Sequence, residues 1–222
     1  MNFEQARFNM IEQQIRTWEV LDNNVLAVLA VVRREDFVPV AHRALAFADL
    51  EIPLPPQTEP GQCMLSPKVE ARMLQDLQVQ KHEKVLEIGT GSGYMAALLA
   101  HRAQQVLSYE IEPQLAARAR VNLQRSGIHN CRVETGDGAA AFFAAADLFD
   151  VIVLSGSVAK VPEALLQHLK IGGRLGAFVG TEPVMRATVM TRVSSSGWRK
   201  VEAWDTLAPR LLGFPEPSAF TF

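Results

Sequence analysis

The stretch that decides the fold is residues 84–100, KVLEIGTGSGYMAALLA. It begins with the short apolar run VLEI, which is typical of a buried strand, and ends with the apolar pattern of a helix. Between these runs lie Gly89, Gly91 and Gly93, which supply a tight turn and let the backbone approach a ligand closely. The stretch therefore predicts a strand, a glycine turn and a helix running through Ala100, arranged to meet a ligand.

Strand and helix patterns alternate from this point onward. Further strands are expected at 106–109, 131–134, 150–154 and 173–179, helices at 113–127 and 162–170, and a closing antiparallel hairpin over 187–204. Strands joined by helical crossovers indicate an α/β fold with a doubly wound, mostly parallel sheet that carries helices on both faces. Such sheets bind ligands beyond the carboxyl ends of their strands.

The first third of the chain lacks this alternation of strand and helix patterns. Residues 3–17 are polar and amphipathic, Asp22 can cap a second helix, and Ser66 followed by Pro67 predicts the start of a third. The prolines between residues 37 and 63 forbid a regular helix there, so we expect an ordered loop. We interpret 1–222 as a single domain, with an N-terminal helical and substrate-loop region at 1–80 and a ligand-binding core at 81–222.

Composition narrows the class of protein. The 222 residues carry a formal net charge of −2, which argues against a large nucleic-acid footprint. The first residues have no apolar signal core, and the longest apolar run is far too short for a membrane span, so we expect a cytoplasmic protein. The two cysteines and five histidines show no disulfide framework and no metal-ligand spacing. The sequence does not reveal the oligomeric state.

Three acids follow successive predicted strands. Glu87 precedes the glycine turn, and Glu110 comes 21 positions after Gly89, where a carboxylate can accept hydrogen bonds from both hydroxyls of a ribose. Asp137 follows the third strand and can accept from an adenine amino group, while Gly138 lets the purine ring lie close to the backbone. The set predicts a nucleoside site.

The turn itself helps to choose between two nucleosides. A dinucleotide site favours G-x-G-x-x-G, but here the place of the third glycine holds Tyr94, which is too bulky. A pyrophosphate also disfavours an acid beside the helix N-terminus, whereas the ammonium group of a methionine would favour Glu87. We therefore expect S-adenosyl-L-methionine, with product S-adenosyl-L-homocysteine, bound by Glu87, by Gly89, Thr90 and Gly91 of the turn, and by Glu110, Asp137 and Gly138.

This set of motifs resembles the class I S-adenosylmethionine-dependent methyltransferases, whose fold is Rossmann-like. The N-terminal region is similar to that of the protein-L-isoaspartate O-methyltransferases, in Met10, Gln14 and Ile15, the FVP at 37–39, the PLP at 53–55 and Gly61-Gln62. VLEIGTGSGY at 85–94 and PRLLG at 209–213 also resemble that family. The resemblance implies carboxyl methylation of damaged, isoaspartyl-containing peptides or proteins. From the charge and the short apolar runs we expect no nucleic-acid or membrane partner.

One loop departs from the family. After Gly-Gln the family usually has Thr-Ile-Ser, one residue and Pro, whereas this chain has CMLSP at 63–67. Without a gap, Cys63 replaces the threonine and Leu65 replaces the serine, and a leucine donates no hydrogen bond. These two positions are the expected substrate-binding residues. With one inserted residue, Ser66 would be the family's serine, unless it only caps the following helix.

The resemblance also implies a catalytic role for Ser66 together with Asp49. Asp49 either orients the substrate or holds its own loop through local backbone hydrogen bonds. Ile111 stands where the family commonly has arginine after the ribose-binding acid. No His–acid or Ser–His pair accompanies the glycine turn, which fits a carboxylate acceptor, because a carboxyl with a pKa of about 4 is already ionised at neutral pH.

Three other functions stay open on the sequence alone. A paralogous methyltransferase would use the altered loop for a small-molecule or different protein acceptor. A protein that binds the methyl donor without catalysis would keep the same glycine turn and acids. A nicotinamide oxidoreductase is the third, and Tyr94 and Glu87 argue against it.

Overall fold

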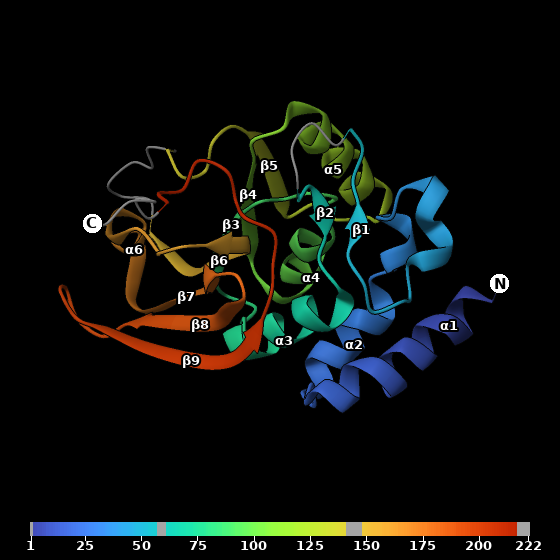
Figure 1. The fold of residues 1–222 in the computed structure, drawn as a ribbon, viewed down its shortest axis with the longest axis horizontal. Helices are drawn as coiled ribbons and strands as arrows, with labels where there is room; N and C mark the ends of the chain where they lie inside the picture. Colours follow the sequence, from blue (N-terminus) through green and yellow to red (C-terminus); the bar gives the residue numbers. More distant parts are fainter. Residues whose placement is uncertain (1, 57–60, 141–147, 217–222) are drawn as a thin grey trace.

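The computed structural model describes residues 2–56, 61–140 and 148–216. Its centre is a sheet with the strand order β5-β4-β3-β6-β7-β8-β9 (Figure 1). The strands are β3 (Lys84–Ile88), β4 (Gln105–Glu110), β5 (Cys131–Thr135), β6 (Phe149–Val158), β7 (Leu169–Thr181), β8 (Val184–Arg192) and β9 (Trp198–Thr206). The first five of these pair in parallel, and β8 and β9 pair antiparallel with β7 and with each other. The predicted α/β fold with a closing hairpin is confirmed.

The order of the strands creates a crevice above β3. The chain runs outward from β3 through β4 to β5 and then returns to place β6 on the other side of β3. The connections after β3 and β6 therefore leave in opposite directions, and in doubly wound sheets ligands bind at this reversal. The glycine turn directly follows β3 at this point.

Helices cover the sheet on both faces. The helices are α1 (Phe3–Met10), α2 (Asn23–Val31), α3 (Pro67–Leu77), α4 (Tyr94–Arg102), α5 (Pro113–Arg125) and α6 (Glu163–Leu166). Successive residues of β3 and β6 point to opposite faces of the sheet and so belong to two different apolar clusters. Val85 and Val151 belong to the cluster that includes side chains of α2 to α5. Leu86 and Ile152 belong to the other, which includes α6. This alternation is the expected consequence of the strand period of two.

The N-terminal region packs against the same core. After α1 the chain continues through π and 3-10 turns to Trp18, and Asp22 caps α2 by accepting from the backbone N–H of Asn24 at 2.8 Å. A two-stranded ribbon of β1 (Ile52–Pro53) and β2 (Cys63–Met64) stands apart from the main sheet. We call residues 47–56 and 61–66 the roof loop. The division of the chain at residue 80 stays a prediction.

One helix differs from the sequence prediction. The helix expected over 162–170 is limited to Glu163–Leu166, and β7 already begins at Leu169, which pairs with Phe149. The N–H of Phe149 donates to the carbonyl of His168 at 2.8 Å, so β6 captures this stretch as strand. The apolar residues of the stretch suit either structure, and tertiary pairing decides between them.

Two features of the described residues bear on membranes and metals. No helix there is long and apolar enough to cross a membrane. No cluster of histidine, cysteine, aspartate and glutamate that could hold a metal ion occurs in the same ranges.

Candidate functional site

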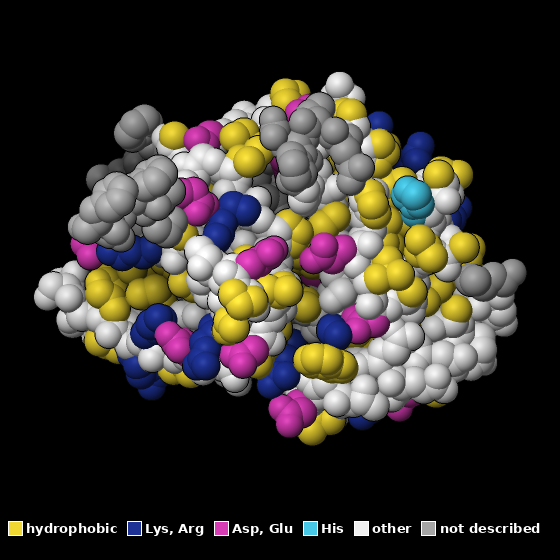
Figure 2. All heavy atoms as spheres, in the orientation of Figure 1, with side chains coloured by type: hydrophobic (Ala, Val, Ile, Leu, Met, Phe, Trp, Pro, Cys, Tyr) yellow, Lys and Arg dark blue, Asp and Glu magenta, His cyan; other side chains and the backbone are white. Residues whose placement is uncertain are grey.

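A cavity lies at the carboxyl ends of β3, β4 and β6, beneath the roof loop. Its wall comes from six segments: Leu54, Gly61, Gln62, Cys63 and Leu65 of the roof loop; Ile88, Gly89 and Gly91; Tyr109, Glu110, Ile111 and Leu115; Asp137 and Gly138; Ser155 and Gly156; and Pro209, Arg210, Leu211 and Leu212. The last four belong to what we call the closing segment, residues 208–214. Figure 2 shows apolar, acidic and basic side chains gathered around this segment in the middle of the displayed face.

Gly89 begins the turn after β3 and shows why a side chain is excluded there. Its φ of +93° lies in the region that favours glycine. A Cβ atom at this position would lie 2.7 Å from Leu211 Cδ2 of the closing segment. The turn and the closing segment are thus in direct contact across the cavity, and the glycine makes that contact possible.

Glu110, the last residue of β4, presents its carboxylate to the cavity. Oε2 accepts from the backbone N–H of Gly91 at 2.7 Å, and Oε1 accepts from that of Glu112 at 3.1 Å. Burial raises the pKa of the carboxyl, and these two hydrogen bonds act in the opposite direction. Each oxygen keeps a further lone pair. The carboxylate therefore keeps acceptor capacity at the cavity wall. Its predicted role in binding two ribose hydroxyls stays a prediction.

Asp137 and Gly138 form the wall after β5. Asp137 Oδ1 accepts from the backbone N–H of Ala139 at 2.8 Å, which fixes the carboxylate at the cavity. A Cβ on Gly138 would lie 2.6 Å from Ile88 Cγ2, so only glycine allows the chain to pass this close to β3. Gly138, Ile88 and the Asp137 carboxylate thus form one part of the cavity wall.

Glu87 lies one layer behind the cavity wall. It is fully buried, and its carboxylate accepts from Ser108 Oγ at 2.6 Å and from Ser155 Oγ at 2.8 Å. Burial raises the pKa of Glu87 to about 8, although both hydrogen bonds lower it. Of these two serines, Ser155 reaches the cavity wall. A role for Glu87 in binding an ammonium group stays a prediction.

Thr90 belongs to the same buried network. Its Oγ1 lies 2.5 Å from Ser108 Oγ, and the residue lines a small adjoining cavity rather than the main one. Of the seven predicted cofactor-binding residues, five therefore line the main cavity: Gly89, Gly91, Glu110, Asp137 and Gly138.

The two predicted substrate-binding residues, Cys63 and Leu65, both line the cavity. Burial, followed by the charge of Glu51, raises the pKa of the Cys63 thiol to about 12, so it stays protonated at neutral pH. The Cys63 Sγ lies 3.6 Å from Glu51 Oε2. The roof of the site consequently offers a weak thiol donor and an aliphatic side chain to the cavity.

Ser66 lies away from the main cavity, and its predicted catalytic role stays a prediction. Ser66 lines a separate groove beside Trp18 and Trp204 rather than the main cavity. Cys63 and Leu65 point to the cavity, and in extended backbone the residues between and after them point the other way. The hydroxyl also forms no capping hydrogen bond within the described ranges, although Ser66 occupies the N-cap position of α3.

Asp49 is also placed away from the cavity. Its Oδ2 lies 2.7 Å from Lys68 Nζ, at the start of α3, and Lys68 in turn lies over the ring of Trp18. The described residues that line the cavity do not include Asp49. The ion pair with Lys68 favours the alternative in which Asp49 holds its own loop. A role in orienting the substrate stays a prediction.

A buried arginine that the sequence did not single out as functional holds the roof loop. Arg34 is fully buried, donates from Nη2 to the carbonyl of Leu65 at 2.7 Å and from Nε to that of Ala46 at 3.1 Å. Its Nη1 pairs with Glu70 of α3. Arg34 therefore ties both ends of the roof loop to the core and sets the position of Leu65 over the cavity.

The closing segment is a second feature that sequence reasoning missed. Its backbone pairs with the end of β6: the Ser157 N–H donates to the Pro209 carbonyl at 2.7 Å, and the Leu211 N–H donates to the Ser157 carbonyl at 2.9 Å. The only signal for it was the resemblance of PRLLG to a family segment. Neither periodicity nor charge indicates that these residues pair with the end of β6 and line the cavity.

Comparison with known proteins gives the family. A family model described as protein-L-isoaspartate(D-aspartate) O-methyltransferase matches residues 5–203. A protein-L-isoaspartate O-methyltransferase from Koribacter versatilis is 37% identical over 211 residues, which cover 95% of this chain and 92% of the relative. One from Methanoculleus marisnigri is 40% identical over 174 residues, covering 78% and 77% of the two chains.

A solved structure shows the same fold. A chain from Plasmodium falciparum, assigned as a protein-L-isoaspartate O-methyltransferase and solved with S-adenosyl-L-homocysteine, superposes with a TM-score of 0.78. The two chains are 17% identical, and the match covers 94% of this chain and 97% of the other. The family model and the relatives together establish the identity expected from the sequence: this chain belongs to the protein-L-isoaspartate O-methyltransferase family.

Proposed function

We propose that this chain transfers the methyl group of S-adenosyl-L-methionine to the free carboxylate of isoaspartyl residues in peptides or proteins. The observation that carries the proposal is the cavity in which the glycine turn, Glu110 and Asp137 face the roof loop. Membership of the family supports both the donor and the acceptor. A cytoplasmic location, and independence from nucleic acid and membranes, remain predictions of the sequence.

The residues present fit the donor. Glu110 is oriented to accept from the two ribose hydroxyls, and Asp137 can accept from the adenine amino group. The purine would pack against the apolar side chains of Ile88, Ile111 and Leu115, which lie on the wall between these carboxylates. Ser155, backed by Glu87, is the polar group available to the methionine portion.

The chemistry needs little from the protein beyond placement. When bound, the donor supplies an electrophilic methyl carbon on a sulfonium: a carboxylate oxygen bonds to that carbon, the carbon–sulfur bond breaks, and sulfur keeps the electron pair. No proton moves, so no general base is required. Leu54, Leu65 and Leu211 line the cavity and exclude water, which strengthens the attraction between the carboxylate and the sulfonium.

A second candidate function rests on the roof loop. Because Cys63 and Leu65 replace hydroxyl donors on the cavity wall, a paralogous methyltransferase with a different acceptor is the alternative. The donor site would be the same in both cases. The acceptor therefore has to be identified by experiment.

The test is methyl transfer from labelled S-adenosyl-L-methionine to an isoaspartyl peptide, compared with its aspartyl twin of the same sequence. The proposal expects transfer to the isoaspartyl peptide alone, and a Leu65→Ser variant should lower KM because it restores a hydrogen-bond donor on the cavity wall. Equal inactivity on both peptides, with S-adenosyl-L-homocysteine still bound in calorimetry, would leave the paralogue as the better account.

A further inference from the structure

One positive side chain lines the donor cavity. Among the described residues on its wall, the charged ones are Glu110, Asp137 and Arg210. The two carboxylates are assigned to the donor nucleoside, and neither suits a second anion. Arg210 is thus the charged group left to meet a negatively charged acceptor.

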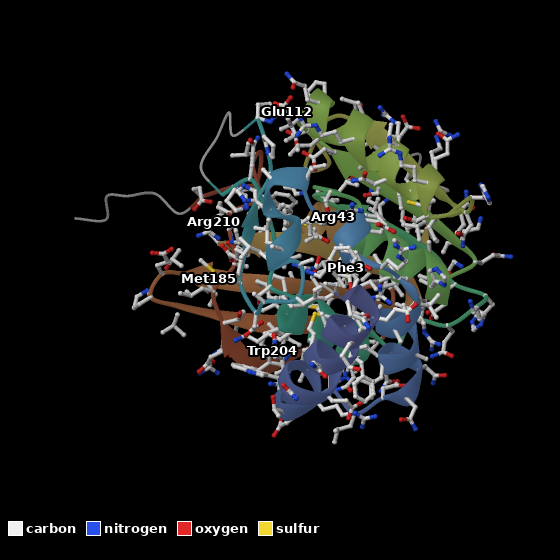
Figure 3. All side chains as sticks on the ribbon, turned by 90° about the vertical axis from the view of Figure 1, so that its right-hand side faces the viewer. Phe3, Arg43, Glu112, Met185, Trp204 and Arg210 are labelled. Atoms are coloured by element: carbon white, nitrogen blue, oxygen red, sulfur yellow. The ribbon has the colours of Figure 1, made fainter. Side chains whose placement is uncertain are left out.

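The backbone of Arg210 is held firmly in place. It forms a parallel bridge with Ser157 at the end of β6, and the hydrogen bonds of Ser157 to residues 209 and 211 lie on either side of it. Figure 3 shows Arg210 on the side of the molecule that also carries Met185 of β8. The closing segment therefore delivers this side chain to a fixed place at the cavity.

Only some of the donors of the Arg210 guanidinium have partners among the described residues. Its Nη1 donates to the carbonyl of Gly180 at 3.0 Å, and its Nε lies 2.9 Å from Glu216 Oε1. Within the described ranges Nη2 has no hydrogen-bond partner. Glu216 is 50% exposed and Arg210 is 27% exposed. A surface ion pair of this kind contributes little energy, so an incoming carboxylate can displace Glu216.

Arg210 also stands where two cavities meet. The donor cavity and a neighbouring groove share Gly61, Pro209 and Arg210. The groove carries the carboxyl groups of Glu51 and Glu182. An acidic group entering from the groove therefore meets favourable charge only at Arg210, and the two glutamates repel it elsewhere.

We propose that Arg210 binds the acceptor carboxylate and so replaces the hydroxyl donors that Cys63 and Leu65 do not provide. The inference rests on the proposed function, because it assigns the acceptor-binding residue of that reaction. A guanidinium offers a planar fork of donors that matches the two oxygens of a carboxylate. Methylation removes the negative charge, so the ester product binds Arg210 more weakly than the substrate and is released.

The experiment measures kcat and KM for the isoaspartyl peptide at saturating donor, in the unaltered protein and in Arg210→Met and Arg210→Lys variants. Loss of a charge-assisted pair should raise KM about tenfold to a hundredfold in Arg210→Met, with a smaller rise in Arg210→Lys. The affinity for S-adenosyl-L-homocysteine should not change. The matched control is Arg186→Met, which removes an arginine of β8 that pairs with Glu202 and Asp205 outside both cavities.

A second measurement isolates the carboxylate. The same peptide with the isoaspartyl carboxylate replaced by a carboxamide serves as a competitive inhibitor. The unaltered protein should bind the carboxylate peptide at least about tenfold more tightly than the amide, and Arg210→Met should abolish this preference. This comparison on the unaltered protein stays informative even when Arg210→Met does not fold.

The possible results separate the two proposals. An unaltered protein that is inactive on the isoaspartyl peptide would overturn the proposed function and this assignment together. An active protein whose Arg210→Met variant keeps its KM and its preference for the carboxylate would overturn the assignment alone. A fall in melting temperature and in S-adenosyl-L-homocysteine affinity, without a change in that preference, would show that Arg210 only anchors the closing segment.

Discussion

Replacing Glu87 tests the buried hydrogen-bond network beneath the cavity. Its carboxyl is fully buried, no cation bonds to it among the described residues, and its two hydrogen-bond partners are the neutral hydroxyls of Ser108 and Ser155. Burial therefore raises its pKa from 4.5 to about 8. A carboxyl that binds its proton more tightly in the folded state stabilises the fold at low pH, and this contribution is lost as the pH rises.

The magnitude follows from the two pKa values. The interval from 4.5 to about 8 spans roughly 3.5 pKa units, and each unit corresponds to about 1.4 kcal/mol. The contribution of Glu87 is fully present below pH 4.5 and declines by up to about 5 kcal/mol by pH 8. Glu87→Gln has nearly the same shape and cannot ionise, so it should not show this decline.

The assay is urea unfolding of the unaltered protein and of Glu87→Gln at four pH values between 5 and 8. The difference in free energy of unfolding should be small at pH 5, and the variant should become increasingly more stable toward pH 8. Glu83→Gln is the control of opposite sign. Burial raises the pKa of Glu83, but hydrogen bonds from Arg174 and Gln80 outweigh this and lower it, so this variant should lose stability at neutral pH. Parallel curves for Glu87→Gln and the unaltered protein would refute the reasoning.

Two further predictions concern packing around the cavity. Arg34→Met leaves the buried Glu70 without its partner and should cost about 3–5 kcal/mol in urea unfolding at pH 8. Burial raises the pKa of Glu70 to about 7 despite Arg34, so the cost in free energy of unfolding should be smaller at pH 5.5. The control is Arg33→Met, because the side chain of Arg33 is 59% exposed, and this variant should show neither effect. Gly138→Val places a Cβ 2.6 Å from Ile88 Cγ2 and should cost about 1–3 kcal/mol of overpacking. A normal melting temperature together with normal S-adenosyl-L-homocysteine affinity would contradict the second prediction.

The sequence predicted the parts of the site that local patterns determine. A glycine turn after an apolar strand, and an acid at the end of the next strand, are fixed by the strand–turn–helix unit itself, so Gly89 and Glu110 were placed correctly on the cavity. Asp137 and Gly138 follow the same rule at the next strand. In each case the carboxyl ends of parallel strands bring the residues together without any need for long-range information.

The sequence was less informative where long-range contacts decide the position of a side chain. Ser66 was named from its place in a motif, but the extended backbone of 63–66 turns it to the opposite side from Cys63 and Leu65. Asp49 was named in the same way, and its geometry depends on Lys68, nineteen positions away in α3. Sequence spacing shows neither the direction of a side chain nor the partner it finds.

The closing segment determines when the wall of the cavity is complete. Its residues follow every strand of the sheet in the sequence, yet Leu211 packs against Gly89 and Gly156. During translation the ribosome therefore delivers this wall after the seven strands of the main sheet. Loss of the segment after Thr206 would remove Leu211 from Gly89 and Gly156 and open the cavity to water on that side.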